Sequence, residues 1–361
     1  PYYSNGESNE GAAFVFLGSS SGLSTSPDWS FESNEEFFNY GWSVSTAGDV
    51  NGDGYSDIIV GEQWYENGQE KEGRAYVYLD SAAGLSSSPS WTAEGNQQEA
   101  YFGRSVSSAG DVNGDGFDEI LVGSPFFDNG EQSEGRVSLY YGSESGPQEF
   151  PEWTSESDVE YAFYGHSVSP AGDLNNDGFS DILVGADGYE AEKSEEGAVF
   201  LYLGSASGLT ISSEWSVEGD RNYSGFGFSV SGAGDVNGDG FGDVIIGADS
   251  YTHGENSEGG AFLFRGISSG LSISPSWTAE SDQQDAGFGE SVSSAGDVNN
   301  DGFSDIIIGA PGYDNGESNE GRAFVYFGSE KGISVSSPWS AEGDQKDARF
   351  GESVSSAGDV N

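Results

Sequence analysis

Five short acidic segments hold the residues of this sequence that are best suited to bind a metal ion. Each has an oxygen-bearing side chain at positions 1, 3, 5 and 9, glycine at position 6 and an aromatic residue at position 7, as in the stretch from Asp49 to Asp57. Alternating oxygens can converge on one hard cation, glycine permits the sharp turn, and the residue at position 7 offers its carbonyl. Oxygen ligands without histidine or cysteine favour Ca²⁺, and so many carboxylates suit Mg²⁺ less.

The pattern differs from an EF-hand, because position 12 is valine or isoleucine in every loop and the last carboxylate stands at position 9. An Asx-rich turn without metal is the alternative. We favour calcium, since three carboxylates in nine residues repel one another without a cation. The second loop ends in Glu119 beside Asp118, which predicts an altered geometry. The expected ligands are Asp49, Asn51, Asp53, Tyr55, Asp57, Asp111, Asn113, Asp115, Phe117, Glu119, Asp173, Asn175, Asp177, Phe179, Asp181, Asp235, Asn237, Asp239, Phe241, Asp243, Asp297, Asn299, Asp301, Phe303 and Asp305, with Asp359 and Asn361 in a truncated sixth loop.

A fixed 62-residue period positions these loops. The first aspartate of each loop recurs at 49, 111, 173, 235, 297 and 359, and a tryptophan recurs with the same spacing from Trp29 to Trp339. No insertion breaks this register. The sequence is therefore one supersecondary unit repeated along the chain.

Each unit contains four strand candidates and no helix. In the fifth unit they are 288–295, 305–309, 322–328 and a weaker one around 336–342, separated by turn-forming Gly, Asn, Asp and Ser. The middle two are apolar on both faces, as expected of strands covered on both sides. A parallel β-helix has much shorter turns, so we predict an all-β fold, a β-propeller of about six four-stranded blades.

The ends of the chain fall inside repeats. We expect a single propeller domain over 1–361 that starts and ends mid-blade, with five full periods and a partial sixth. The missing piece corresponds to 300–310. Either six units close with one strand absent from this chain, or a longer array was cut, in which case seven blades fit equally well.

The residues around the loops resemble a known repeat. Phe288-Gly289 precedes the fifth loop, and Gly309-Ala310-Pro311 follows the next strand. This arrangement resembles FG-GAP repeats, as in the propeller of integrin α subunits and in many bacterial surface proteins. The resemblance implies a propeller with calcium between two strands of a blade, extracellular and often adhesive. Tyr40 and Tyr164 replace the phenylalanine, three units lack the proline, and integrin propellers have seven blades.

Composition excludes several classes of protein. Acidic residues number 62 against 11 basic ones, giving a net charge of −51, which opposes binding to nucleic acid or anionic lipid. The sequence has no cysteine, no apolar run long enough to insert into a membrane and no signal peptide at its start. No unique catalytic constellation stands out from the repeat, so we do not expect an enzyme.

Four further patterns bear on binding. The periodic tryptophans either pack within the fold or form sugar-stacking platforms, as in a lectin. The glutamate of each Glu-Gly pair, from Glu10 to Glu320, either belongs to a turn before a strand or joins the metal or a loop network. The residue after Phe-Gly varies, so we expect it to line a channel or face. Recognition is expected in the variable loops 62–72, 124–134, 186–196, 248–258 and 310–320.

These observations predict a calcium-binding extracellular protein with a structural or adhesive role. Five complete loops would bind Ca²⁺, and the variable loops would contact other proteins or copies of itself, at a cell surface or in a filament. Glycans are a further class of partner. The alternative is a carbohydrate-binding lectin with repeated sugar sites.

Overall fold

The computed structural model describes residues 3–5, 8–33, 39–268, 270–335, 337 and 339–358. These residues form strands, turns and loops, and none of them forms a helix. They fall into two compact units, one within Pro1–His166 together with the residues from Ala357 onward, and the other within Ser167–Ser356. The prediction of one domain over the whole chain stays a prediction.

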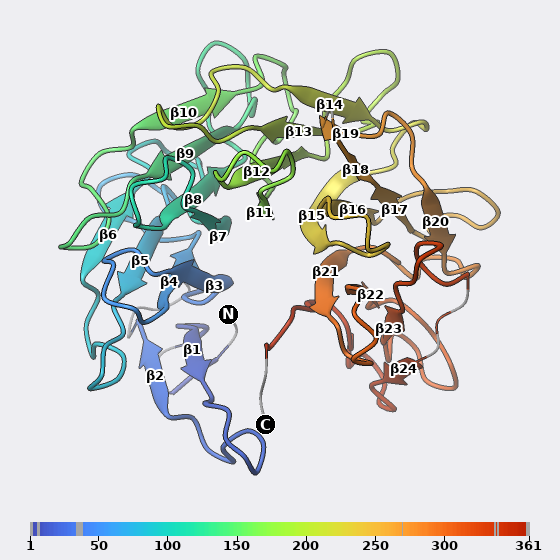
Figure 1. Cartoon of the computed structure of the whole chain (residues 1–361), viewed down its shortest axis with the longest axis horizontal. Helices are drawn as coiled ribbons and strands as arrows, with labels where there is room; N and C mark the ends of the chain where they lie inside the picture. Colours follow the sequence, from blue (N-terminus) through green and yellow to red (C-terminus); the bar gives the residue numbers. More distant parts are fainter. Residues whose placement is uncertain are drawn as a thin grey trace. The chain divides into compact units, whose positions relative to one another are not determined.

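The first unit contains a two-stranded sheet and two four-stranded sheets, all antiparallel (Figure 1). The strands of these sheets are, in chain order, β1 (Ala12–Val15), β2 (Trp29–Glu32); β3 (Ser43–Gly48), β4 (Asp57–Glu62), β5 (Arg74–Tyr78), β6 (Trp91–Glu94); β7 (Ser105–Gly110), β8 (Glu119–Ser124), β9 (Arg136–Tyr140) and β10 (Trp153–Glu156).

The second unit contains three four-stranded sheets and one short hairpin. Its strands are β11 (Ser167–Gly172), β12 (Asp181–Ala186), β13 (Ala198–Tyr202), β14 (Trp215–Glu218); β15 (Phe226–Gly234), β16 (Asp243–Ala248), β17 (Gly260–Phe264), β20 (Trp277–Glu280); β21 (Ser291–Gly296), β22 (Asp305–Ala310), β23 (Arg322–Tyr326), β24 (Trp339–Glu342); and the hairpin β18 (Gly266–Ile267) with β19 (Gly270–Leu271). The predicted all-β architecture of four-stranded propeller blades is confirmed.

A bulge sets the start of every acidic loop. In the first four-stranded sheet the register shifts between Thr46 and Gly48, and the same shift recurs in the other four-stranded sheets described. Gly48 has a φ of 76°, a backbone conformation that glycine adopts without strain. The Ala-Gly-Asp string therefore ends the first strand and turns the chain into the loop.

The core lies between neighbouring blades. The second strand is buried along its whole length in β8, β12 and β16. In the first unit, Ile59 of β4 and Val77 of β5 share one buried cluster with Val122 of β8 and Tyr140 of β9. A blade covered on both faces needs apolar residues on both, which accounts for the continuous apolar runs in the sequence.

Three of the periodic tryptophans connect one blade to the next. The indole N–H of Trp277 donates to the carbonyl of Ser334 at 3.1 Å, and its ring meets Tyr326 edge-on with centroids 5.0 Å apart. Trp29 and Trp91 make the equivalent bonds, at 3.0 and 2.9 Å. These three rings are therefore engaged in blade packing, and the alternative of sugar-stacking platforms stays untested.

We expect Trp277→Ala to lower the free energy of unfolding by about 2 kcal/mol or more, because it removes an aromatic contact and leaves a void between blades. Trp339, at the same position of the repeat, is 50% exposed. Trp339→Ala is the matched control, with an expected loss below about 1 kcal/mol. Denaturant unfolding of the two variants checks this prediction, and equal losses would contradict the connection between blades.

Candidate metal centres

The first aspartate of each acidic loop organises the loop's backbone. Asp49 accepts hydrogen bonds from the backbone N–H groups of Asp53, at 3.0 Å, and Gly54, at 2.8 Å. Asp111, Asp173, Asp235 and Asp297 accept the same pair of bonds in their own loops. Each loop thus holds its oxygen-bearing side chains in one turn without any help from another chain.

The carboxylate at position 9 has a second role that the sequence did not reveal. Asp57 is fully buried and accepts a hydrogen bond from the N–H of Val50, within the loop, at 3.1 Å. Its other oxygen accepts from the N–H of Asp80, just beyond β5, at 2.7 Å. Asp181, Asp243 and Asp305 make the same two contacts. This residue therefore ties the loop to the end of the third strand.

Burial makes these carboxylates costly to ionise without a cation. It raises the pKa of Asp57, Asp181 and Asp243 to about 6, and the aspartates at positions 5 and 1 of each loop add a smaller repulsion in the same direction. Burial likewise raises the pKa of Glu119 to about 8. A bound cation would reverse this penalty, because an opposite charge favours the ionised form.

The second loop brings its carboxylates closest together. One oxygen each of Asp111, Asp115 and Glu119 lies within 4.8 Å of the others. Glu119 replaces the usual aspartate, and its additional methylene carries the carboxylate toward the other two. Asp118 accepts a hydrogen bond from the N–H of Asp49 at 2.7 Å and so links this loop to the preceding one.

The donor set fits a hard divalent cation such as Ca²⁺. The expected side chains at positions 1, 3, 5 and 9 all offer oxygen donors. Among the described residues, the second loop is the one acidic loop whose three carboxylates lie within 4.8 Å of one another. Asp359 and Asn361, of the sixth loop, lie outside the described residues. The contribution of the position-7 carbonyls stays a prediction.

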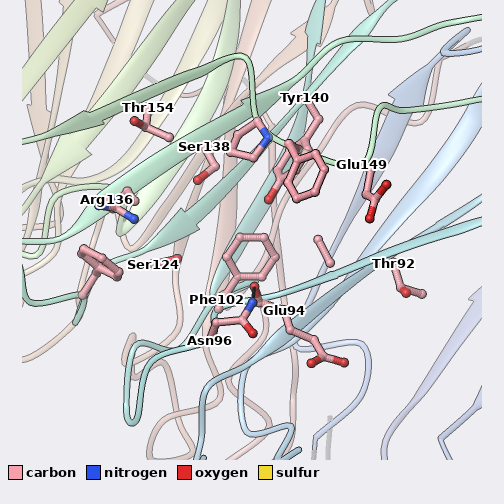
Figure 2. A pocket seen from close by; sticks show the side chains of 15 residues that line it. Thr92, Glu94, Asn96, Phe102, Ser124, Arg136, Ser138, Tyr140, Glu149 and Thr154 are labelled. Atoms are coloured by element: carbon pink, nitrogen blue, oxygen red, sulfur yellow. Dashed lines mark hydrogen bonds between the residues drawn. The ribbon is translucent and has the colours of Figure 1, made fainter.

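A cleft between neighbouring blades of the first unit is separate from the acidic loops. It has a volume of about 430 Å³ and lies between β6 and the β8–β10 part of the next sheet (Figure 2). Arg136 lines it but bonds to Glu156 through Nε, at 2.6 Å, and covers the ring of Phe127. No histidine, lysine or cysteine is among its fifteen lining residues, and we derive no catalytic role from it.

Aromatic side chains gather at the end of the first unit's blades opposite the acidic loops. Successive strands are antiparallel, so the turn from second to third strand and the entry to the first strand share that end. Trp42 stacks on Trp64 with ring centroids 6.5 Å apart, and the guanidinium of Arg104 lies 4.7 Å from the Trp42 ring. Phe126 contacts Tyr101 at 4.8 Å and Phe163 at 5.1 Å. All six are half-buried, and we call them the aromatic surface.

The position after Phe-Gly contributes to this surface. Arg104, besides covering Trp42, lies 2.9 Å from Nε2 of His166 through Nη2, so residues from three successive repeats meet. In the second unit, Arg349 bonds to Glu290 at 3.0 Å and to Glu352 at 3.2 Å. The expected variability of this position therefore appears as contacts between repeats, aromatic and cationic in one unit and ionic in the other.

Comparison with known proteins identifies the repeat. The FG-GAP repeat model matches residues 40–78, 102–140, 164–202, 226–264 and 288–326, together more than half of the chain. The chain belongs to the FG-GAP repeat family. Each matched segment runs from the Phe-Gly or Tyr-Gly pair to the end of the third strand and contains one complete acidic loop.

The relatives that match include integrin α chains. The chain is 35% identical over 212 residues to integrin alpha-4 of Xenopus laevis, covering 58% of this chain and 19% of that one. It is 34% identical over 238 residues to integrin alpha-8 of Gallus gallus (63% and 21%) and 33% identical over 217 residues to integrin alpha-V of Gallus gallus (58% and 20%). The chain thus spans about a fifth of the length of these relatives.

Solved structures give a weaker likeness. The exotype rhamnogalacturonan lyase YesX aligns with a TM-score of 0.42 and 14% identity over 91% of this chain and 61% of that one. Rhamnogalacturonan lyase YesW gives 0.41 and 12% over 81% and 50%. Neither value is high enough to bear on activity. Among the described residues, no helix has the length and apolarity that a membrane crossing requires.

Proposed function

We propose that this chain is the calcium-binding, protein-interaction part of an extracellular adhesion or surface-assembly protein. The observation that supports this most directly is the aromatic surface, where Trp42, Trp64 and Arg104 from variable positions of successive repeats converge. Aromatic and arginine side chains that are half-buried and mutually supported are typical of protein-binding hot spots. The integrin relatives favour the same class of function.

Calcium would act structurally in this proposal. A cation bound by Asp49, Asn51, Asp53 and Asp57 would neutralise the carboxylates of the loop. Because Asp57 also holds the N–H of Asp80, the cation would fix the loop to the third strand. Weak sites suit this role outside the cell, where extracellular modules bind calcium with dissociation constants of about 10⁻⁴–10⁻³ M. The blades would then present the aromatic surface on a rigid support.

We expect Trp42→Ser to reduce attachment of chain-coated beads to cells of the producing organism at least tenfold in calcium buffer, because it removes the ring between Trp64 and Arg104. The matched control is Ile211→Ser, which removes an apolar side chain that is 95% exposed and lies outside the aromatic surface. Bead counts under flow give the readout. Equal attachment of all three proteins would contradict the proposal, as would the absence of any calcium-dependent attachment by the wild-type chain. Sedimentation of the same samples distinguishes self-association from binding to another protein.

A further inference from the structure

A second group of carboxylates lies at the other end of the blades, away from the acidic loops. Glu258, which precedes the third strand of its blade, groups with Glu280 and Asp282 at the end of the fourth. One oxygen of each lies within 4.8 Å of the other two. The same group recurs two repeats earlier as Glu134, Glu156 and Asp158. The two groups therefore stand in register, two repeats apart.

Each of the two groups contains a fully buried glutamate with an oxygen that makes no regular hydrogen bond. Glu258 is fully buried, and its Oε1 accepts three backbone N–H groups, from His253, Gly254 and Glu255 at 2.7, 2.6 and 3.2 Å. Its Oε2 has no hydrogen-bond partner. Glu134 is also fully buried, and the backbone N–H groups of Asn129 and Glu131 that face it lie outside strict hydrogen-bond geometry. A buried carboxylate oxygen without a partner remains free to bind a cation.

In the blade between these two, a lysine side chain bonds to the equivalent glutamate oxygen. Glu196 occupies the equivalent position, is fully buried, and its Oε1 accepts N–H groups from residues 191–193. Its Oε2 accepts instead from the ammonium of Lys193 at 2.9 Å, and that ammonium also reaches the carbonyl of Gly219 at 3.3 Å. The residues in register with Lys193 are Glu131 and Glu255. The side chain at this position of the repeat is therefore positively charged in one blade and negatively charged in the other two.

We propose that Glu258, Glu280 and Asp282 bind a divalent cation, Ca²⁺ by the chemistry of their oxygens, and that Glu134, Glu156 and Asp158 bind a second. The first site has the greater need of a metal. Arg136 neutralises Glu156 in one blade, whereas Gly260 occupies the equivalent position in the other. There, His253 lies 2.8 Å from Glu280 through Nδ1. The proposal does not rest on the adhesive function or on metal binding by the acidic loops.

Calcium bound at these sites would also hold the variable loops in place. Glu258 organises the backbone of residues 253–255, which belong to the loop between β16 and β17. A cation held there by Glu280 and Asp282 would fasten that loop to the end of β20. The acidic loops brace one end of a blade, and the second group would brace the end that carries the recognition loops.

A charge exchange between blades tests the proposal. Glu255→Lys reproduces the lysine of the neighbouring blade, and we expect it to bind one Ca²⁺ fewer per chain than wild type at saturating calcium. Lys193→Glu gives that neighbouring blade the acidic residue found in the other two, and we expect it to bind one more. Calcium alone is the probe, counted by equilibrium dialysis and elemental analysis. Glu214→Lys is the control with the same charge change at an exposed residue outside both groups of carboxylates, and it keeps the wild-type count.

Glu258→Gln distinguishes two roles of this residue, binding a metal ion and accepting hydrogen bonds from the loop backbone. The amide oxygen can still accept the three backbone N–H groups, while the NH₂ takes the place of the unpartnered oxygen and cannot bind a cation. We expect one Ca²⁺ fewer per chain with an unchanged circular dichroism spectrum. Wild-type counts in both Glu258→Gln and Glu255→Lys would overturn the proposal. Asp239→Asn, in the acidic loop of the same blade, reports separately on that loop, so the two classes of site can fail independently.

Discussion

Chelation of calcium at pH 8 is expected to lower the thermal unfolding midpoint of this chain by roughly 10 °C or more. Five acidic loops each add a binding term of about 3 kcal/mol when calcium is a hundredfold above its dissociation constant. For a chain of this size, each kcal/mol corresponds to roughly 2 °C or less. The whole effect therefore depends on many equivalent loops, and loss of a single one, as in Asp301→Ala, shifts the midpoint far less.

The effect of chelation should be smaller at pH 5.5 than at pH 8. Without metal, burial raises the folded-state pKa of Asp57, Asp181 and Asp243 from 3.8 to about 6, and that of Glu119 from 4.5 to about 8. A carboxyl whose pKa is raised by folding stabilises the fold while it is protonated, and this contribution is lost as the pH rises through the folded-state value. We therefore expect the metal-free chain to be least stable above pH 8, where ionised carboxylates would favour calcium binding most.

Scanning calorimetry with calcium or with chelator, at both pH values, measures this difference. Sodium chloride at matched ionic strength is the control, because any salt screens the repulsion within a chain of net charge −51. A midpoint that responds equally to sodium and calcium would show that screening, not loop binding, stabilises the blades. The same midpoint at pH 5.5 and pH 8 in chelator would contradict the role given to the buried carboxylates.

The repeat made much of this fold predictable from sequence. A 62-residue period without insertions locates the four strands, and the regular spacing of oxygens from Asp49 to Asp57 locates the candidate metal loops. What escaped prediction involves partners that are distant in sequence. Asp57 bonds to the N–H of Asp80, 23 residues away, and Trp277 bonds to Ser334, 57 residues away. The pairing of strands within one blade determines the first contact, and the position of one blade on the next determines the second. No local pattern encodes either.

The Glu-Gly pairs illustrate the same limit at a candidate site. The sequence left two interpretations open for this glutamate, a turn before a strand or a metal or loop network. In the structure the two oxygens of Glu258 differ. One accepts hydrogen bonds from the backbone of the preceding turn, and the other is buried without a hydrogen-bond partner. Only the comparison with Lys193, which supplies a charge to the equivalent glutamate, distinguishes a cap from a candidate ligand. That distinction needs three-dimensional coordinates.

Gly247→Ala is expected to lower the free energy of unfolding by about 3 kcal/mol or more, although alanine suits a strand better than glycine does. Gly247 lies in β16 at the glycine of the Gly-Ala-Pro motif. An added Cβ would come within 3.0 Å of the carbonyl oxygen of Gly289 and of the Ser229 hydroxyl. Gly289 is the glycine of the next Phe-Gly pair, and its carbonyl already accepts a hydrogen bond from Ser229 at 2.8 Å. The two motifs that define the repeat are therefore the two sides of one close contact between blades.

Gly84→Ala is the matched control, because it isolates backbone strain from steric overlap. Gly84 has a φ of 91°, and no atom lies within 4 Å of an added Cβ, so only strain of about 1 kcal/mol is expected. Backbone angles alone predict the opposite order, since the left-handed region is the one that disfavours alanine. Ser229→Ala combined with Gly247→Ala removes the hydroxyl overlap but leaves the carbonyl, so the double variant should stay far below wild type. Equal denaturation midpoints for Gly247→Ala and Gly84→Ala would mean that neighbouring blades can separate without cost, and the motif would then need another explanation.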